Sequence, residues 1–329
     1  MNIKYYDGCS RSGKMYGGDS GLKKGILYQG EKWLLKYPKS TNDMNNVRVS
    51  YTTSPLSEYI GSHIYEILGF PVHETNMGIA DGKLVVACKD FVQPGKEFFD
   101  FRSIKNDYLS ENSKYFESHS SESGGNTDLN SALMVVKNNL KNVEGASERF
   151  WDMFVIDAFI NNNDRNNGNW GYLYDQVSGK IELAPIFDNG GSFYNKKTDS
   201  EFTRFLSNDR VLHDNAVASV ISAYEIDRHK IHAFLFMEEH HNEYAELSDA
   251  ILRNSERIDN HMTDIKQMIS EIPEFVIHDD VKYQVMSDTY KEYIYAILDI
   301  RKEKLHELAE EIIREREEEQ YIIHSDYER

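Results

Sequence analysis

The sequence contains very little cysteine and no long apolar run. Cys9 and Cys88 are its two cysteines, about eighty positions apart, which suggests neither a zinc knuckle nor a disulfide scaffold. No stretch approaches the roughly 18 apolar residues of a membrane span, and no apolar segment follows the N-terminal charge as in a secretory leader. We therefore expect a cytoplasmic protein with reduced thiols, although export by a non-classical route stays open.

Positive charge is also scarce. The chain has 37 Lys and Arg against 55 Asp and Glu, which gives a formal net charge of −18. This charge opposes nucleic acids and anionic membranes at long range, so we expect neither as a partner. It would oppose a nucleotide as well, so a nucleotide site would need local lysines, backbone N–H groups and a divalent cation.

A glycine-rich segment lies near the N-terminus. Residues 12–25 hold five glycines and three lysines, and residues 26–28 and 32–37 are predicted to form a β-hairpin behind them. Strand alternation puts Trp33, Leu35 and Tyr37 on one face and Lys36 on the other. Glycines allow backbone N–H groups to approach phosphates closely, and Lys23 and Lys24 are nearby.

A helix and a strand follow this hairpin. Ser54-Pro55 predicts a helix with Ser54 as its N-cap, and Gly69 ends it. Residues 83–88 predict a strand. Glu58, near the start of the helix, is the expected ion-pair partner of Lys36, which would reach the α and β phosphates of a nucleotide. Glu66 is the alternative partner if the helix is rotated.

The most informative segment comes later. An apolar pattern over residues 148–161 predicts a buried helix, followed by a polar loop, by strands at 171–174 and 181–187, and by Asp188-Asn189-Gly190. Asp164 and Asn169 are five positions apart, the spacing of the Asp and Asn in the protein-kinase catalytic loop, and Asp188 precedes a glycine as the metal-binding Asp does. Phosphoryl transfer needs positioning and charge neutralisation, so we assign Asp164 to the acceptor hydroxyl and Asn169 and Asp188 to Mg²⁺.

These motifs support a resemblance to a known family. Asn-Asp-Arg-Asn-Asn-Gly-Asn-Trp-Gly at 163–171, Ala-Pro-Ile-Phe-Asp at 184–188 and Phe-Trp-Asp-Met-Phe-Val at 150–155 resemble the C-terminal domain of HipA-like kinases. Residues 85–91, which include Lys89 and Phe91, resemble the hinge of this family. Residues 57–59 resemble its helix C. The likeness spans roughly residues 15 to 210.

The resemblance implies an α+β, two-lobed kinase fold that uses ATP with Mg²⁺ to phosphorylate Ser or Thr of proteins and of its own small lobe. We place the small lobe at residues 1–92 and a larger, mainly helical lobe at 93–329, with a flexible insertion at 109–128. Ser20, beside Gly21 in the glycine-rich segment and with Ser12 behind it, matches the neighbourhood of a regulatory Ser in HipA. The chain departs from HipA in having Asn166 where His is usual and in lacking a substantial N-terminal extension, so a HipB-like antitoxin partner is not implied.

Other functions stay open. A lipid kinase resembling type II phosphatidylinositol 4-kinases shares the Asp-Arg and Asn-Trp elements, although the net charge argues against an anionic bilayer. A pseudokinase or interaction module would bind nucleotide without turnover, and an adenylyl transferase would move a different group. For the biological role, toxin, effector and regulator all stay open.

Overall fold

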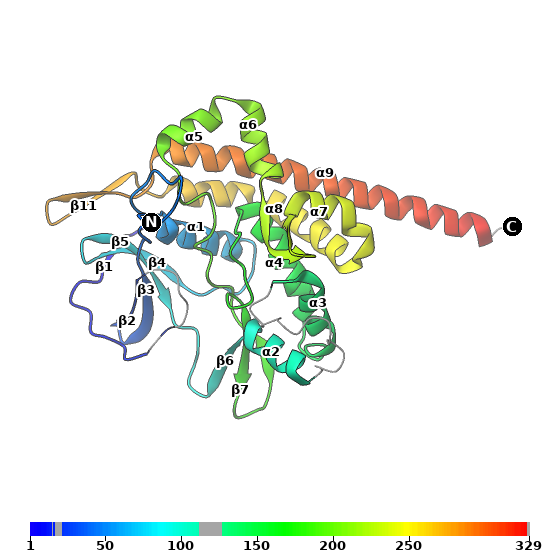
Figure 1. Cartoon of the computed structure of the whole chain (residues 1–329), viewed down its shortest axis with the longest axis horizontal. Helices are drawn as coiled ribbons and strands as arrows, with labels where there is room; N and C mark the ends of the chain where they lie inside the picture. The colour runs from blue at the N-terminus through cyan, green and yellow to red at the C-terminus, as the bar shows by residue number, and fades with distance from the viewer. Residues whose placement is uncertain (15, 17–21, 112–126, 328–329) are drawn as a thin grey trace.

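The computed structural model describes residues 1–14, 16, 22–111 and 127–327. A β-rich N-terminal part lies beside a helical C-terminal part, and the last helix projects away from both (Figure 1). The predicted α+β class is confirmed. Ser20 and Gly21, and residues 112–126 of the expected insertion, lie outside the described residues. Residues 109–111 of that insertion end one helix, and residues 127 and 128 lie just before the next.

The first sheet has five strands in the order β1-β4-β5-β3-β2. Their bounds are β1 Lys4–Tyr5, β2 Lys23–Tyr28, β3 Glu31–Lys36, β4 Thr75–Ala80 and β5 Lys83–Lys89. The predicted hairpin is β2-β3, closed by Gln29 and Gly30, both with positive φ as a two-residue turn demands. Trp33, Leu35 and Tyr37 are buried together, as their alternation predicted.

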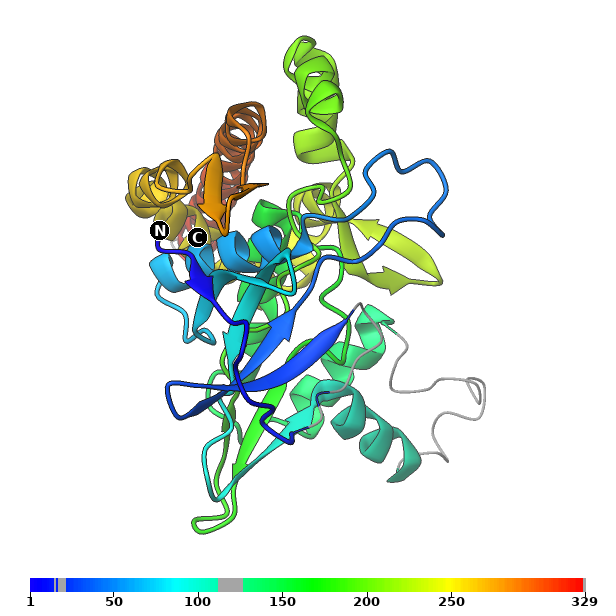
Figure 2. The ribbon, with the colours of Figure 1, turned by 90° about the vertical axis from the view of Figure 1, so that its left-hand side faces the viewer.

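One helix, α1 (Ser54–Ile67), packs on this sheet (Figure 2). Ile60 and Ile64 are fully buried, and Gly69 follows the helix with a φ of +86°, a conformation that favours glycine. Thr53 is the N-cap, so the prediction of Ser54 is wrong by one residue. Pro55 lies in the first turn, where its missing N–H costs nothing.

A second sheet joins chain segments that are far apart in sequence. It has the order β6-β7-β8, with bounds β6 Lys96–Asp100, β7 Gly171–Asp175 and β8 Ile181–Leu183. The strand predicted over 181–187 is shorter than expected, because Pro185 has no N–H to continue the ladder. Ile186 instead forms a parallel bridge with Val72, which connects the segment before Asp188 to the residues after α1.

The remaining chain is largely helical, as expected. The elements are α2 Phe101–Glu111, α3 Leu129–Asn138, α4 Ala146–Ile160, α5 Asp199–Leu206, α6 Asp209–His213, η2 Asp214–Ala218, α7 Ala233–His240, η3 His241–Glu243, α8 Ala245–Ser270 and α9 Asp288–Tyr327. Two hairpins were not predicted: β9 Ile221–Ile226 with β10 His229–His232, and β11 Phe275–His278 with β12 Val281–Gln284. Among the described residues, no helix is both long and apolar enough to cross a membrane.

The helix α4 lies at the centre of the helical part, in contact with α3, α7, α8 and α9. Nearly all its side chains are buried, which explains the apolar residues around its whole circumference. Arg301 of α9 is fully buried and donates hydrogen bonds to the carbonyl oxygens of Phe159 (3.0 Å) and Ala216 (2.7 Å). The last turn of α4 is therefore held from the far end of the chain.

Candidate active site

A cavity of about 750 Å³ lies between the two sheets. Its walls include parts of β2, β3, β5 and β6, the segment after β5 and the start of α2. The loop after α4 and the residues before Gly190 complete them. It brings together most of the residues predicted for the site, namely Lys23, Lys36, Lys89, Phe91, Asp164, Asn169 and Asp188.

Lys36 is the centre of the charged network in this cavity. Its Nζ lies 2.8 Å from Oε2 of Glu58 and 2.8 Å from Oδ1 of Asp188. Burial alone would lower the pKa of Lys36, but the two carboxylates raise it well above its usual value. For Glu58 the effects are reversed: burial alone would raise its pKa, but Lys36 and His73 lower it below its usual value. Lys36 and Glu58 therefore stay charged at neutral pH.

The hairpin register decides which lysines reach the cavity. Lys23 pairs with Lys36 across β2 and β3, and Lys24 pairs with Leu35 of the buried face. Directly paired residues point to the same side of a sheet. Lys24 is accordingly turned away: its ammonium contacts Asp81 and lies over the ring of Tyr37. The prediction that Lys24 contributes to nucleotide binding is corrected by this register.

The polar loop after α4 is held by Arg165. Its guanidinium donates to both oxygens of Asp157, at 2.9 Å and 3.1 Å, and to the carbonyl oxygen of Asn169 at 3.0 Å. It also donates to the carbonyl oxygen of Phe187 and to Oδ1 of Asn189. The side chain is 2% exposed, so Arg165 is a buried brace that connects the loop to the Asp188 segment.

Within this loop, Asp164 and Asn169 are placed by short local contacts. Nδ2 of Asn169 donates to the carbonyl oxygen of Asp164 at 2.5 Å, which leaves the amide oxygen as the donor atom for a cation. Nδ2 of Asn166 donates to Oδ1 of Asp164 at 3.0 Å. The protein packed around the carboxyl group raises the pKa of Asp164, and the charge of Asp188 adds to this effect.

An apolar wall lies beside these charges. The ring of Phe187 lies 5.5 Å, between centroids, from the rings of Phe91 and Phe98, which are themselves 5.5 Å apart. Phe91 was predicted as a site residue, whereas Phe98 and Phe187 were missed. The place of these two rings in the cavity wall depends on how β6 pairs with β7. A flat apolar group between polar ends is what such a wall accommodates.

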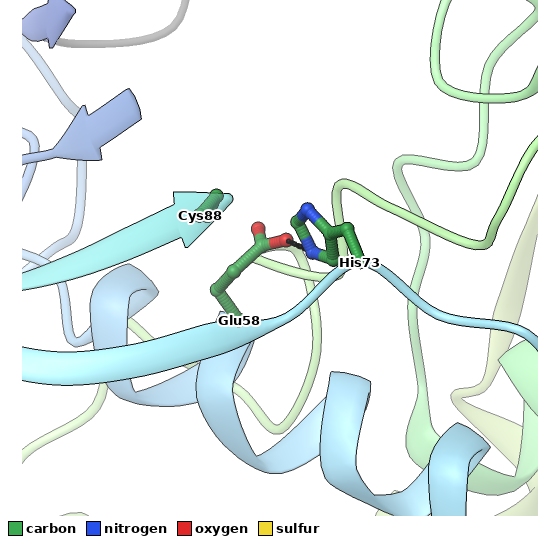
Figure 3. Close-up of side chains that lie close together, drawn as sticks. All are labelled: Glu58, His73 and Cys88. Atoms are coloured by element: carbon green, nitrogen blue, oxygen red, sulfur yellow. Dashed lines mark ion pairs between the residues drawn. The ribbon is translucent and has the colours of Figure 1, made fainter. Parts of the chain in front are cut away.

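His73 was also missed. Its Nε2 lies 3.1 Å from Oε1 of Glu58, on the side of the carboxylate opposite Lys36, and its backbone N–H donates to the carbonyl oxygen of Ile186 at 3.0 Å (Figure 3). No local pattern marks it in the sequence, since it lies between elements and reaches Glu58 only in the folded chain.

Comparisons with known proteins agree with this geometry. No protein-family model matches the chain. It is 34% identical over 298 residues to the serine/threonine-protein kinase CtkA of Helicobacter pylori, covering 90% of this chain and 84% of that protein. The crystal structure of the Helicobacter pylori proinflammatory kinase CtkA matches with a TM-score of 0.79 and 31% identity, over 95% of this chain and 98% of that one.

A more distant structure shares the fold. HipA of Shewanella oneidensis, solved with HipB and operator DNA, matches with a TM-score of 0.50 and 12% identity, over 92% of this chain and 68% of that one. The extent and identity of the match to CtkA, together with this fold, show that the chain belongs to the HipA-like serine/threonine protein kinases.

Proposed function

We propose that this kinase uses ATP and Mg²⁺ and transfers the γ-phosphoryl group to Ser or Thr hydroxyls of proteins, including its own. The observation that carries the proposal is Lys36, held at 2.8 Å by both Glu58 and Asp188 in the cavity that Asp164 and Asn169 line. A kinase needs the lysine–glutamate pair and the metal-binding aspartate in place at the same time. The contacts of Lys36 with Glu58 and Asp188 in one network support this assignment.

The oxygen donors of Asn169 and Asp188 fit Mg²⁺, a hard cation that prefers carboxylate and amide oxygens. When bound, Mg²⁺ neutralises charge on the phosphates. Lys36 and Lys23 point into the same cavity and would bind phosphate oxygens, and the wall of Phe91, Phe98 and Phe187 would hold the adenine ring.

Asp164 would act on the acceptor. Its carboxylate lines the cavity and accepts a hydrogen bond from Asn166, which fixes its orientation toward an incoming hydroxyl. Its raised pKa brings it nearer to the pH at which it would accept a proton as the phosphoryl group is transferred. Arg165 does not reach the phosphates in this arrangement, because its donors are used by Asp157, Asn169 and the Asp188 segment.

The test uses the purified full chain with Mg²⁺ and ATP labelled at the γ position, without other proteins. We expect the wild type to label itself, with no HipB-like partner needed, and Asp164→Asn and Asp188→Asn to fall by at least about 100-fold. Asp43→Asn, in an exposed loop, is the matched control. Labelling by ATP marked at the α position would instead indicate adenylyl transfer.

Two further results would change the proposal. Wild-type labelling no greater than that of the two site variants would contradict an active enzyme and favour a nucleotide-binding module. Transfer to phosphatidylinositol vesicles in preference to protein would favour the lipid-kinase alternative. Mass spectrometry of the wild type then locates the modified residue, which we expect at Ser20 or Ser12.

A further inference from the structure

Glu58, His73 and Cys88 form a buried cluster (Figure 3). His73 and Cys88 also belong to the lining of the cavity. They come from α1, from the segment between α1 and β4, and from β5. Their exposed fractions are 0%, 6% and 3%, and one ligand atom from each lies within 4.8 Å of the other two. Three different metal-binding groups thus meet at one point of the fold.

The donor set is typical of zinc. A carboxylate oxygen, an imidazole nitrogen and a thiolate sulfur are its usual protein ligands, and three of them leave a fourth position open. In a tetrahedral site with bonds of about 2.0–2.3 Å, the ligand atoms lie roughly 3.3–3.7 Å apart. Glu58 and His73 are already at 3.1 Å, so the main adjustment is a movement of the Cys88 side chain by at most about 1.5 Å.

An ion could reach this cluster from the cavity. Cys88 and His73 both line the cavity wall, whereas Glu58 lies behind them. The open coordination position would therefore face the cavity and could be filled by water.

The charges also balance. Burial raises the pKa of the Cys88 thiol, so the ion must displace its proton, which leaves through the cavity to water. One divalent cation, the Cys88 thiolate and the Glu58 carboxylate then sum to zero. Lys36 would keep its other partner, Asp188, at 2.8 Å. A neutral unit of this kind avoids an uncompensated buried charge.

We propose that Glu58, His73 and Cys88 bind Zn²⁺ or a similar transition-metal ion, and that this ion competes with ATP and Mg²⁺ by neutralising the Glu58 carboxylate that attracts Lys36. Asp188 is an expected Mg²⁺ ligand, so a site loaded with nucleotide leaves Lys36 dependent on Glu58. The metal site itself is independent of the proposed function. The competition between metal and nucleotide rests on the proposed function. Because linkage is reciprocal, nucleotide must weaken metal binding by the same factor that metal weakens nucleotide binding.

The first experiment is a titration of the metal-free full chain with Co²⁺, followed by displacement with Zn²⁺. A thiolate bound to cobalt gives a charge-transfer absorption band, which carboxylates on an acidic surface do not give. We expect the band in the wild type and in Cys9→Ser, its loss in Cys88→Ser, and weaker binding by at least about tenfold in His73→Gln. Cys9 is the matched control, since it is the other cysteine of the chain and half-buried.

The second experiment repeats the titration with saturating ATP and Mg²⁺. We expect the apparent dissociation constant for the metal to rise at least about tenfold. No thiolate band in the wild type, or a band that Cys9→Ser removes, would overturn the site and leave an adventitious ion only. A band that nucleotide does not weaken would overturn the competition. A chain that binds cobalt through Cys88 but does not bind ATP or label itself would refute the proposed function and leave the metal site standing.

Discussion

Arg165→Lys tests whether the loop around Asp164 depends on a buried brace. The substitution keeps the positive charge but removes the planar fork that donates to both oxygens of Asp157. A single ammonium cannot also reach Asn169 and the Asp188 segment, so at least two charge-assisted hydrogen bonds are lost at a site that is 2% exposed. At about 1.5 kcal/mol for each bond, the free energy of unfolding should fall by about 3 kcal/mol.

The same substitution should slow the reaction. Arg165 joins the catalytic loop to Phe187 and Asn189, on either side of Asp188. A displacement of about 1 Å between reacting groups costs roughly 100-fold in rate. We therefore expect the self-labelling rate at saturating ATP to fall by about that factor, even under conditions where the variant is fully folded.

The assay combines urea denaturation, followed by circular dichroism, with initial rates of labelling. Arg210→Lys, on the exposed surface of α6, is the matched control and should leave both quantities unchanged. If Arg165→Lys kept the stability and the labelling rate of the wild type, the role of Arg165 as a brace would be refuted. Wild-type stability with a much lower rate would refute it too, and would indicate that Arg165 contacts the substrate instead.

Three other predictions follow from named contacts. Glu58→Gln should lose about 3 kcal/mol of stability at pH 7. Because the folded state lowers the pKa of Glu58, the stabilisation by its charge is complete above the unfolded pKa of about 4.3 and is lost as the pH falls. The difference in Tm between the variant and the wild type should therefore narrow between pH 5 and pH 3, and a constant difference would refute the ion pair. Gly171→Ala should lower the free energy of unfolding, measured by thermal denaturation, by about 2 kcal/mol, because an added Cβ would lie 2.2 Å from the carbonyl oxygen of Phe99. Gly179→Ala, in an open turn at a φ of +71°, should lower it by about 1 kcal/mol. Equal losses of stability in the two variants would contradict the close approach of β6 and β7. Phe91→Ala should raise the KM for ATP about tenfold with little change in kcat, and an unchanged KM would remove Phe91 from the nucleotide wall.

The grouping of Asp164, Asn169 and Asp188 around one cavity could be predicted because its information is local. Asp164, Asn169 and Asp188 follow one helix and flank one hairpin, so their spacing alone identifies the unit. The β2-β3 register was available in the same way: the two-residue turn at Gln29-Gly30 pairs Lys23 with Lys36, which already separates Lys23 from Lys24.

The features that escaped prediction depend on long-range contacts or on unusual turns. His73 meets Glu58 only after α1 packs on the sheet, and the wall formed by Phe98 and Phe187 depends on the pairing of β6 with β7. The β9-β10 and β11-β12 hairpins turn at Asp227-Arg228 and Asp279-Asp280, all with positive φ. Without glycine or asparagine, these turns carry a weak sequence signal.

The position of Arg301 determines how short a working version of this protein can be. Every motif that we assign to the site lies before residue 191, so a fragment that ends ahead of α9 would contain all of them. That fragment would nevertheless lose Arg301, which donates a hydrogen bond to the carbonyl oxygen of Phe159. This carbonyl lies in the last turn of α4, where the helix has no N–H of its own to pair with it. Because Asp164 comes five residues after Phe159, removing the last helix would loosen the catalytic loop. The smallest autonomous kinase unit therefore includes a helix that carries no recognisable motif.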